Sequence, residues 1–233
     1  MKWVRDATGR LPERPHYTPD ELDRECETLL ASRRAPSSFP LTTDDLTVLL
    51  EAHASDLDLF ADLSADGDAV EGLTEFLAQG KPRVRISAGL SASPRSAHRL
   101  RTTLAHELGH VRFHAFLWKG SGLRGVRCLR ESIARPRSSD WLEWQASYAS
   151  GAILMPVTAL RRAAQALLHD RPTPYYSRFE PARRLVRHVA RTFDVSETAA
   201  RVRLTSAGLL TDDVPAGLRS RFLPTRGSSP LVR

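Results

Sequence analysis

Apolar residues recur at helical spacing through most of the chain. Leu46, Leu49 and Leu50 share one face of the segment LTTDDLTVLLEAHA, which predicts a helix with Thr43 or Asp44 as its N-cap. Further helices are predicted over residues 94–118, 139–155 and 156–170, and a helix pair over 181–208. The pattern therefore indicates a mostly helical protein.

One region follows the two-residue period of a β-strand instead. In residues 83–87 (RVRIS), arginines alternate with valine and isoleucine, and a second short run covers residues 70–77. The intervening AQGKP carries the glycine and proline of a turn. A hairpin with one face in the core is expected, which gives an α+β fold class with a small antiparallel sheet.

Composition divides the chain into three parts. Residues 1–40 hold several prolines and charges around one helical pattern, PDELDRECETLLASRR, and are interpreted as a tail or docking helix. Residues 41–210 form the main domain, within which the basic, glycine- and serine-containing segment 119–140 is expected to be a loop. Residues 211–233 have prolines and little periodicity, so disorder is expected there.

The overall composition is that of a soluble protein, with 233 residues, 41% of them hydrophobic and 26% charged. The longest apolar stretch, residues 149–160, is too short to span a membrane, and the N-terminus lacks the apolar centre of a signal peptide. We expect a cytoplasmic protein with no membrane partner. Cys26 and Cys128 are too few for a disulfide framework and are interpreted as free thiols. The net charge of +7 favours polyanions or acidic protein surfaces without specifying a fold.

The predicted helix 94–118 contains the sequence TTLAHELGHVRFH. His106 and His110 are four residues apart, so both imidazoles lie on one face of a helix and can bind one metal ion. Glu107 points along a different edge, where it can act as a base on water without binding the metal. His114 extends the spacing but lies about 12 Å from His106 along the helix axis. It is therefore expected to pack at the helix end or support a ligand rather than bind the same ion.

A catalytic zinc site needs a third protein ligand and an open position. Glu143 lies on the next predicted helix, in DWLEWQASYASGAILMP, and is one of two glutamates between Lys119 and Pro156. A helix packed beside the first can present this carboxylate to the two histidines. The alternative is a surface glutamate among tryptophans.

Two segments, RLRTTLAHELGHVRFH and EWQASYASGAILMP, occur in this order and resemble the hallmark motifs of the ImmA/IrrE family of metallopeptidases. The hairpin sequence VEGLTEFLAQGKPRVRIS resembles the element before that family's active-site helix. The resemblance extends over about residues 41–210. It implies that His106, His110 and Glu143 bind the metal and that Glu107 is the catalytic general base.

The chain departs from the family motif at two positions. Ser147 stands where the family usually has Asn, and Ala149 where it has Phe. Position 147 is one helical turn after Glu143 and suits a residue that orients a metal ligand. A serine there is expected to weaken that support without removing a ligand.

The resemblance implies a zincin-like fold, with the small antiparallel sheet beside the active-site helix. It also implies a zinc-dependent endopeptidase, with another divalent metal as the alternative ion. The implied substrate is a helix-turn-helix repressor of a mobile element or stress regulon. The aromatic residues Phe113, Phe116, Trp141 and Trp144 are expected to pack between the two metal-bearing helices.

Two other interpretations remain. The helix pair 181–208 has the length and turn of a helix-turn-helix, so the protein is alternatively a DNA-binding regulator that uses Arg201 and Arg203. Buried apolar residues on the same helices would instead make the pair a packing unit. The third interpretation is a binding subunit whose metal site is structural or inactive.

Overall fold

The computed structural model describes residues 1–31, 39–67, 69–119, 124–129, 140–169 and 180–210. The helices are α1 (Pro19–Ala31), α2 (Thr43–His53), α3 (Ala88–Ser91), α4 (Ala97–His114), α6 (Trp141–Leu154), α7 (Val157–His169), α8 (Glu180–Thr192) and α9 (Glu197–Ser206), with short 3-10 turns at Ser64–Asp66, Pro94–Ser96 and Ala115–Trp118. The strands are β1 (Lys2–Arg5), β2 (Glu13–His16), β3 (Asp56–Ala61), β4 (Val70–Phe76), β5 (Arg83–Ser87) and β6 (Arg124–Leu129). The α+β fold class and its mostly helical content agree with the sequence prediction.

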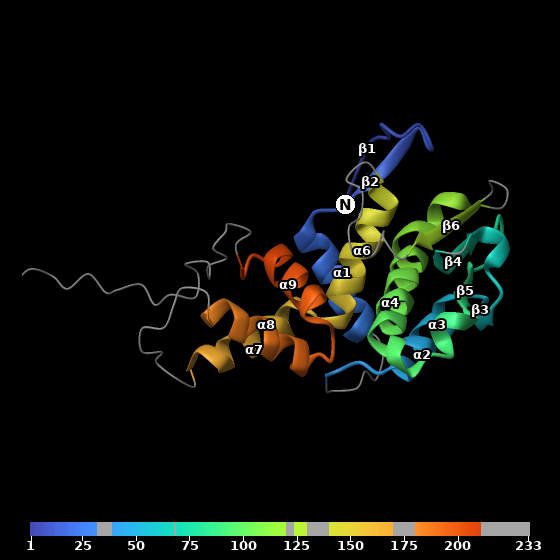
Figure 1. Ribbon diagram of the computed structural model, residues 1–233. Helices are drawn as coiled ribbons and strands as arrows, with labels where there is room; N and C mark the ends of the chain where they lie inside the picture. Colours follow the sequence, from blue (N-terminus) through green and yellow to red (C-terminus); the bar gives the residue numbers. More distant parts are fainter. Residues whose placement is uncertain (32–38, 68, 120–123, 130–139, 170–179, 211–233) are drawn as a thin grey trace, which may run out of the picture.

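Helix α4 lies between the sheet and the other helices (Figure 1). Strand β4 packs on one side of α4, and α6 packs antiparallel on the other side. Helix α1 covers the far side of α6, and α9 joins α6 to the α7–α8 pair. The protein therefore has α4 and α6 at its centre, where residues on their facing sides are removed from water.

The contact between α4 and α6 is made by small residues. A β-carbon added at Gly109 would lie 3.1 Å from the Cα of Ala146 and 3.2 Å from the β-carbon of Ala149, so glycine lets the two helices approach closely. The expected aromatic packing between them is wrong for Phe116. Its side chain is 37% exposed and lies against Trp3 on the surface.

The other aromatic residues of that prediction separate into different contacts. Phe113 packs edge-on against Tyr17 in the main core. Trp141 belongs to a second cluster of buried residues, together with Phe76, Trp118 and Leu142. Trp144 packs beside Tyr148 at the edge of the main core. The sequence indicated that these rings pack against the protein, but it did not indicate which neighbours each ring contacts.

The sheet has the strand order β3-β5-β4-β6 and is mixed rather than purely antiparallel. The expected hairpin is confirmed, because β4 and β5 pair antiparallel with Gly72 opposite Ile86 and Thr74 opposite Val84. Strand β3 pairs parallel to β5, and β6 pairs antiparallel to β4. The prediction of a loop throughout residues 119–140 is thus wrong for β6. Its sequence, RGVRCL, contains two arginines and a glycine, and β6 lies at the edge of the sheet, with β4 as its neighbouring strand.

The N-terminal segment is part of the core rather than a free tail. Helix α1 buries Leu22, Cys26, Leu29 and Leu30 in the same cluster as α4 and α6. Strands β1 and β2 form an antiparallel hairpin that the sequence did not predict. The docking helix of the sequence prediction is present and fully docked.

Helix ends follow the local sequence closely. Helix α2 begins one residue earlier than predicted, because Thr42 is its N-cap and forms a capping box with Asp45. Ser196 caps α9 as expected, accepting a hydrogen bond from the backbone N–H of Ala199. Gly208 follows α9 with a φ of 71°, which suits a glycine C-cap.

Arg203 of α9 is buried, which contradicts its expected role on a DNA-binding face. It is 2% exposed and donates a 2.6 Å hydrogen bond to Asp23 of α1. Val202 of the same helix is 57% exposed, so it does not contribute to the packing of the helix pair. The tail 211–233 lies outside the described residues, so its expected disorder stays a prediction.

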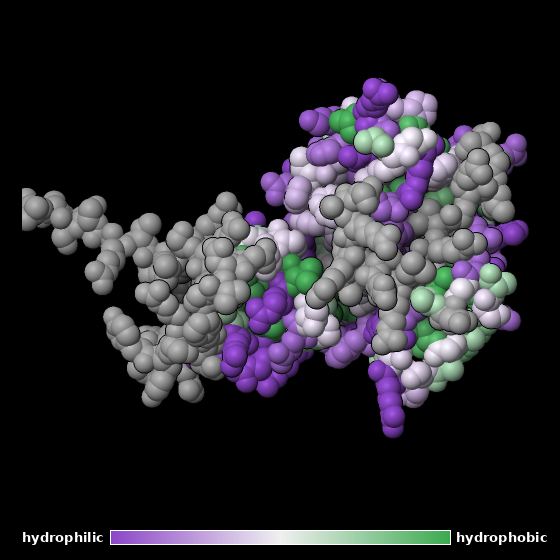
Figure 2. All heavy atoms as spheres, turned by 45° about the horizontal axis from the view of Figure 1, so that its top comes forward, coloured by the Kyte–Doolittle hydropathy of each residue, from purple (hydrophilic) through white to green (hydrophobic). Residues whose placement is uncertain are grey.

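Hydrophilic residues dominate the described surface on the face shown in Figure 2, with small hydrophobic areas between them. Within the described residues, no helix is both long enough and apolar enough to cross a membrane.

Candidate metal centre

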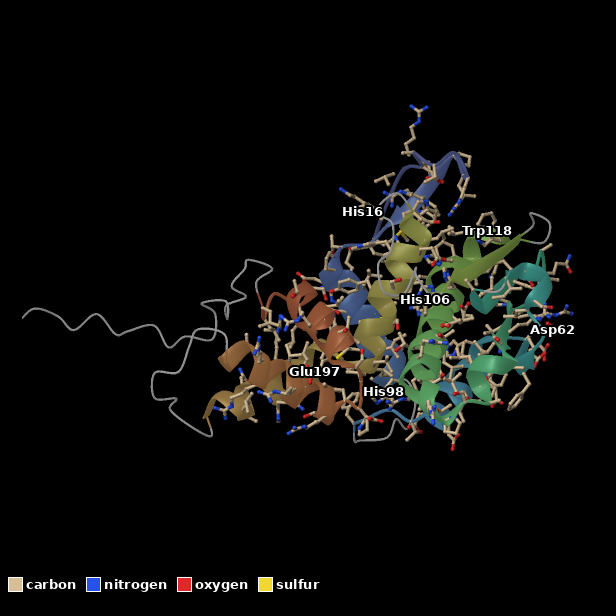
Figure 3. All side chains as sticks on the ribbon, viewed as in Figure 1. His16, Asp62, His98, His106, Trp118 and Glu197 are labelled. Atoms are coloured by element: carbon tan, nitrogen blue, oxygen red, sulfur yellow. The ribbon has the colours of Figure 1, made fainter. Side chains whose placement is uncertain are left out.

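Helix α4 places three of the predicted functional side chains in the interior. His106, Glu107 and His110 are all 0% exposed, and the position of His106 at the centre of the molecule is labelled in Figure 3. The Nε2 atoms of His106 and His110 are 3.0 Å apart. This proximity follows from the four-residue spacing, which places both rings on one face of the helix.

Glu143 comes from the first turn of α6, whose N-cap is Asp140. Its Oε2 lies 3.3 Å from His106 Nε2, and its Oε1 lies 3.2 Å from His110 Nε2. Ligands about 2.0–2.1 Å from a tetrahedral zinc ion are separated from one another by about 3.3 Å. The three side chains therefore have the donor atoms and the spacing that a divalent metal of this kind requires.

The charges at the site favour a cation between these groups. Burial alone would raise the pKa of Glu143, but hydrogen bonding to His106 and His110 outweighs it and lowers the pKa well below its usual value. Burial alone would lower the pKa of His110, but the Glu143 carboxylate outweighs burial and raises it. A deprotonated carboxylate in this interior thus stabilises positive charge beside it.

Glu107 points away from the three ligands and toward β4. Thr74 Oγ1 donates a 2.5 Å hydrogen bond to Glu107 Oε2, while Oε1 is buried and has no hydrogen-bond partner among the described residues. Burial raises the pKa of Glu107 above its usual value, and the nearby histidines and Thr74 oppose that shift. One oxygen is therefore fixed by Thr74, and the other lies buried without a hydrogen bond from the described residues.

Gly72 provides the space for this carboxylate. A β-carbon at position 72 would lie 2.9 Å from Glu107 Cδ, closer still to Oε1, and 3.0 Å from Thr103 Cγ2. Any larger side chain on β4 at this point would displace the glutamate. The glycine and Thr74 lie on the same strand, so β4 positions Glu107 from two sides.

His114 lies outside the group of candidate metal ligands and contacts one of its members, His110. The Nδ1 atoms of His110 and His114 are 2.9 Å apart, and His114 Nε2 lies 3.0 Å from Gln145 Oε1. Gln145 Nε2 in turn donates to the backbone oxygen of Pro15, at 3.0 Å. Burial lowers the pKa of His114 well below its usual value, so the ring is neutral at pH 7 and has one donor and one acceptor nitrogen.

These contacts determine which nitrogen donates the hydrogen bond at each step from His110 through His114 to Gln145. Gln145 Oε1 accepts only, so His114 Nε2 carries the hydrogen and His114 Nδ1 accepts from His110. His110 Nδ1 is then protonated, which leaves the lone pair of Nε2 directed at the metal position. The predicted supporting role of His114 thus agrees with its contacts.

Ser147 contacts the other histidine. Its Oγ lies 3.4 Å from His106 Nδ1, on the side of the ring opposite the nitrogen that faces Glu143. The residue that departs from the ImmA/IrrE motif is therefore placed as the sequence predicted, beside a ligand. At this length the hydrogen bond is weak.

Comparison with known protein families agrees with this geometry. The family model for peptidase M78, described as an IrrE N-terminal-like domain, matches residues 75–205, which are more than half of the chain. The chain belongs to the M78 family. This membership confirms the resemblance to ImmA/IrrE and indicates a metallopeptidase. No curated protein was found that matches the chain.

The M78 match begins within β4 and omits the N-terminal hairpin, α1, α2 and β3. The structure nevertheless brings one of these omitted elements to the metal centre, through the contact of Gln145 with Pro15. Sequence reasoning did not find Gly72, Thr74 or Gln145. The one available signal was the glycine inside a predicted strand, since such glycines often mark a close approach.

Proposed function

We propose that the protein is a zinc-dependent endopeptidase. The observation that carries the proposal is the buried group of His106, His110 and Glu143, with the buried carboxylate of Glu107 on the same helix, one of its oxygens having no hydrogen-bond partner among the described residues. A zinc ion held by these three side chains would polarise a substrate carbonyl and lower the pKa of a water molecule. Another divalent metal is the alternative, because the same donors also suit other ions.

Glu107 would perform the proton transfers. Its Oε1 would accept a proton from water as the water attacks the peptide carbonyl, and would then give that proton to the leaving amine. Thr74 keeps Oε2 engaged, so only one carboxylate oxygen turns toward the reaction. No nucleophilic serine or cysteine is needed, and the peptide bond is hydrolysed in one addition and one breakdown step.

The proposed substrate is a protein, specifically a helix-turn-helix repressor of a mobile element or stress regulon. Support comes from the ImmA/IrrE resemblance, whose members act on such repressors, and from the M78 match. A role in transcription regulation and a cytoplasmic location are part of the same proposal, since repressors act there.

The first test is metal content and peptidase activity of purified wild type, His110→Ala, Glu143→Ala and Glu107→Gln. Elemental analysis should find about one zinc per chain in wild type and Glu107→Gln and little in the other two variants, because only these lose a donor. Glu107→Gln should retain less than about 1% of the wild-type activity, since general bases contribute about 100-fold or more.

Three results would contradict the proposal in different ways. Retention of zinc by folded Glu143→Ala would remove Glu143 from the ligand set. Full activity of Glu107→Gln would remove the base. A zinc-loaded wild type that cleaves no protein or peptide would favour the inactive metal site instead.

The competing DNA-binding function has one supporting observation. Helix α8 exposes Arg183, Arg187 and Arg191, although Arg203 of the supposed recognition helix is buried against Asp23. A triple glutamine variant of the α8 arginines should leave metal content and peptide cleavage unchanged. Salt-dependent binding of duplex DNA that this variant loses would support the competing function.

A further inference from the structure

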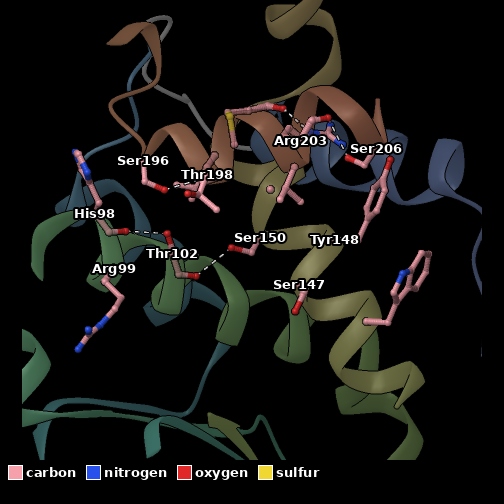
Figure 4. Close-up of a pocket in the computed structure, with 16 residues that line it drawn as sticks. His98, Arg99, Thr102, Ser147, Tyr148, Ser150, Ser196, Thr198, Arg203 and Ser206 are labelled. Carbon is pink, nitrogen blue, oxygen red and sulfur yellow. Dashed lines mark hydrogen bonds between the residues drawn. The ribbon is translucent and has the colours of Figure 1, made fainter. Parts of the chain in front are cut away.

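A cavity opens between α4, α6 and α9, with a volume of about 470 Å³ (Figure 4). Its walls come from the first turns of α4, the middle and end of α6, and the outer face of α9. Trp144, Tyr148, Leu154, Ala199 and Val202 supply its apolar surface. The volume is in the range of pockets that bind small molecules or large side chains.

Several polar groups around this cavity are engaged with the protein, whereas Arg203 Nη1 and Arg99 Nε have no hydrogen-bond partner among the described residues. Thr102 Oγ1 donates to the backbone oxygen of His98, and Ser150 Oγ donates to that of Thr102 (Figure 4). Ser206 Oγ donates to the backbone oxygen of Arg203. The Arg203 guanidinium pairs with buried Asp23. The apolar walls therefore supply most of the surface that a ligand would contact, with these two nitrogens as additional donors.

The cavity adjoins the metal centre through Ser147. Its side chain lines the cavity and also lies 3.4 Å from His106 Nδ1. Ser147 follows Glu143 by one turn of α6, and Trp144 is the next residue after Glu143. The His106 ring lies between Ser147, on its Nδ1 side, and Glu143, on its Nε2 side.

Val202 gives the α9 wall an apolar side chain that solvent reaches. It is a large apolar residue, 57% exposed, and it lines the cavity. Because Ser147 lies both in the cavity wall and against His106, a substrate side chain close to the scissile bond is the part of a bound peptide nearest to the cavity.

We propose that this cavity is a specificity pocket that binds a bulky aliphatic or aromatic side chain of the substrate, close to the scissile bond. The inference rests on the proposed peptidase function and specifies its substrate class. Complete burial of such a side chain corresponds to a preference of about 10- to 100-fold over a small polar residue.

The test compares Val202→Glu with Val48→Glu. Both valines are exposed on helix surfaces, at 57% and 43%, but Val48 lies on α2 and does not line the cavity. Zinc-loaded proteins are incubated with a degenerate peptide library, and residue preferences around the cut are read by mass spectrometry. Wild type and Val48→Glu should prefer large apolar residues at one position, and Val202→Glu should lose that preference at least 10-fold. No apolar preference in wild type, or its retention in Val202→Glu, would overturn the pocket.

A binding measurement separates failure of the pocket from failure of the peptidase. N-acetyl-phenylalaninamide is titrated into Glu107→Gln and followed by NMR, with N-acetyl-serinamide as the polar reference. The aromatic probe should bind at least 10-fold more tightly than the serine probe, and addition of Val202→Glu should abolish the difference. If wild type cleaves nothing but this difference is present, the peptidase proposal fails and the apolar pocket stands. If the two probes bind equally, the pocket fails whatever the activity.

Discussion

Three of the four histidines of α4, His106, His110 and His114, have different surroundings despite their regular spacing. His106 and His110 turn Nε2 toward Glu143, whereas His114 turns both nitrogens to the protein, one to His110 and one to Gln145. A neutral ring between one donor and one acceptor fixes which nitrogen of the preceding ring carries its hydrogen. The third histidine thus determines the tautomer of the second.

Replacing Gln145 by Leu should weaken metal binding. The change leaves the three ligands in place but removes the acceptor that orients His114, and loss of such supporting groups costs about 10- to 100-fold in metal affinity. Competition with a fluorescent zinc chelator measures the change. Gln165→Leu, at an exposed position of α7, is the control and should bind zinc as wild type does. Equal affinity in both variants would show that His114 needs no such orientation.

Gly72→Ala should reduce catalysis while metal binding persists. The added β-carbon would occupy the position of the Glu107 carboxylate, which lies outside the ligand set. Displacement of a catalytic group by about 1 Å lowers the rate about 100-fold, so kcat/KM should fall by that factor. Gly89→Ala is matched to it, because a β-carbon there meets only Ser87 Oγ at 3.7 Å. Unchanged kcat/KM in Gly72→Ala would mean that the position of Glu107 does not depend on the space left by Gly72, or that Glu107 is not the catalytic base.

At the scale of elements, the site depends on one helix that supplies two ligands, a second that supplies the third, and a strand that positions the base. The spacing in α4 predicted its own contribution, since i and i+4 side chains share a face whatever surrounds the helix. Glu143 was found because few glutamates follow the motif. Thr74 and Gln145 were not, because a threonine in a strand and a glutamine in a helix have no local feature that marks a distant partner.

The same limit applies to the fold. The hairpin of β4 and β5 has a turn and an alternating pattern, and both were sufficient to predict it. Strand β3 pairs in parallel with β5, although β4 lies between them in the sequence. Strand β6 pairs with β4, although β5 and α4 lie between them. Neither strand is therefore joined to its partner by a short turn. Non-local pairing leaves no signal in a short window of sequence.

The β1–β2 hairpin should give the protein an acid-sensitive contribution to stability. Asp6 accepts hydrogen bonds from Thr8, from the Leu11 backbone N–H and from the Trp141 ring of α6. Burial alone would raise the pKa of Asp6, but these bonds outweigh it and lower the pKa. A lowered folded-state pKa stabilises the protein above the unfolded value, near 3.9, and that stabilisation is lost as the pH falls through the folded value.

Asp6→Asn should therefore lower the free energy of unfolding by about 1–2 kcal/mol at pH 7. The difference from wild type should shrink below about pH 4 as the wild-type carboxyl is protonated. Urea unfolding at pH 7 and pH 3 measures it, with exposed Asp56→Asn as the reference. A difference that stays constant with pH would assign the cost to altered packing instead of charge.

At the scale of the whole molecule, one buried ion pair joins the beginning of the chain to its last described helix. Asp23 of α1 accepts from Arg203 of α9, at 2.6 Å, and from the Tyr148 hydroxyl of α6, at 3.1 Å. Arg203 also donates to the backbone oxygen of Met155 and lies over the Tyr148 ring. Three helices from distant parts of the sequence are held by this one network.

Asp23→Ala should destabilise the protein by about 3–5 kcal/mol, because it leaves the Arg203 charge buried without its partner. The double variant Asp23→Leu with Arg203→Met should recover much of that loss, since it removes both charges. Chemical denaturation measures both, and Asp20→Ala at an exposed position of α1 should change stability by less than about 0.5 kcal/mol. A double variant as unstable as Asp23→Ala would show that the charge left behind is not the source of the cost.

The hydrogen-bond chain from His110 ends at the carbonyl of Pro15, far upstream of residue 75, where the M78 match begins. Residues 75–205, which the family shares, therefore do not include Pro15, which completes the hydrogen-bond chain behind His110. A fragment cut at the edge of the shared segment would retain His106, His110, Glu143 and Glu107, but the Gln145 amide would lose the Pro15 carbonyl that fixes its orientation beside His114. The residues that the M78 match covers and the residues that support the metal ligands therefore begin at different points of this chain.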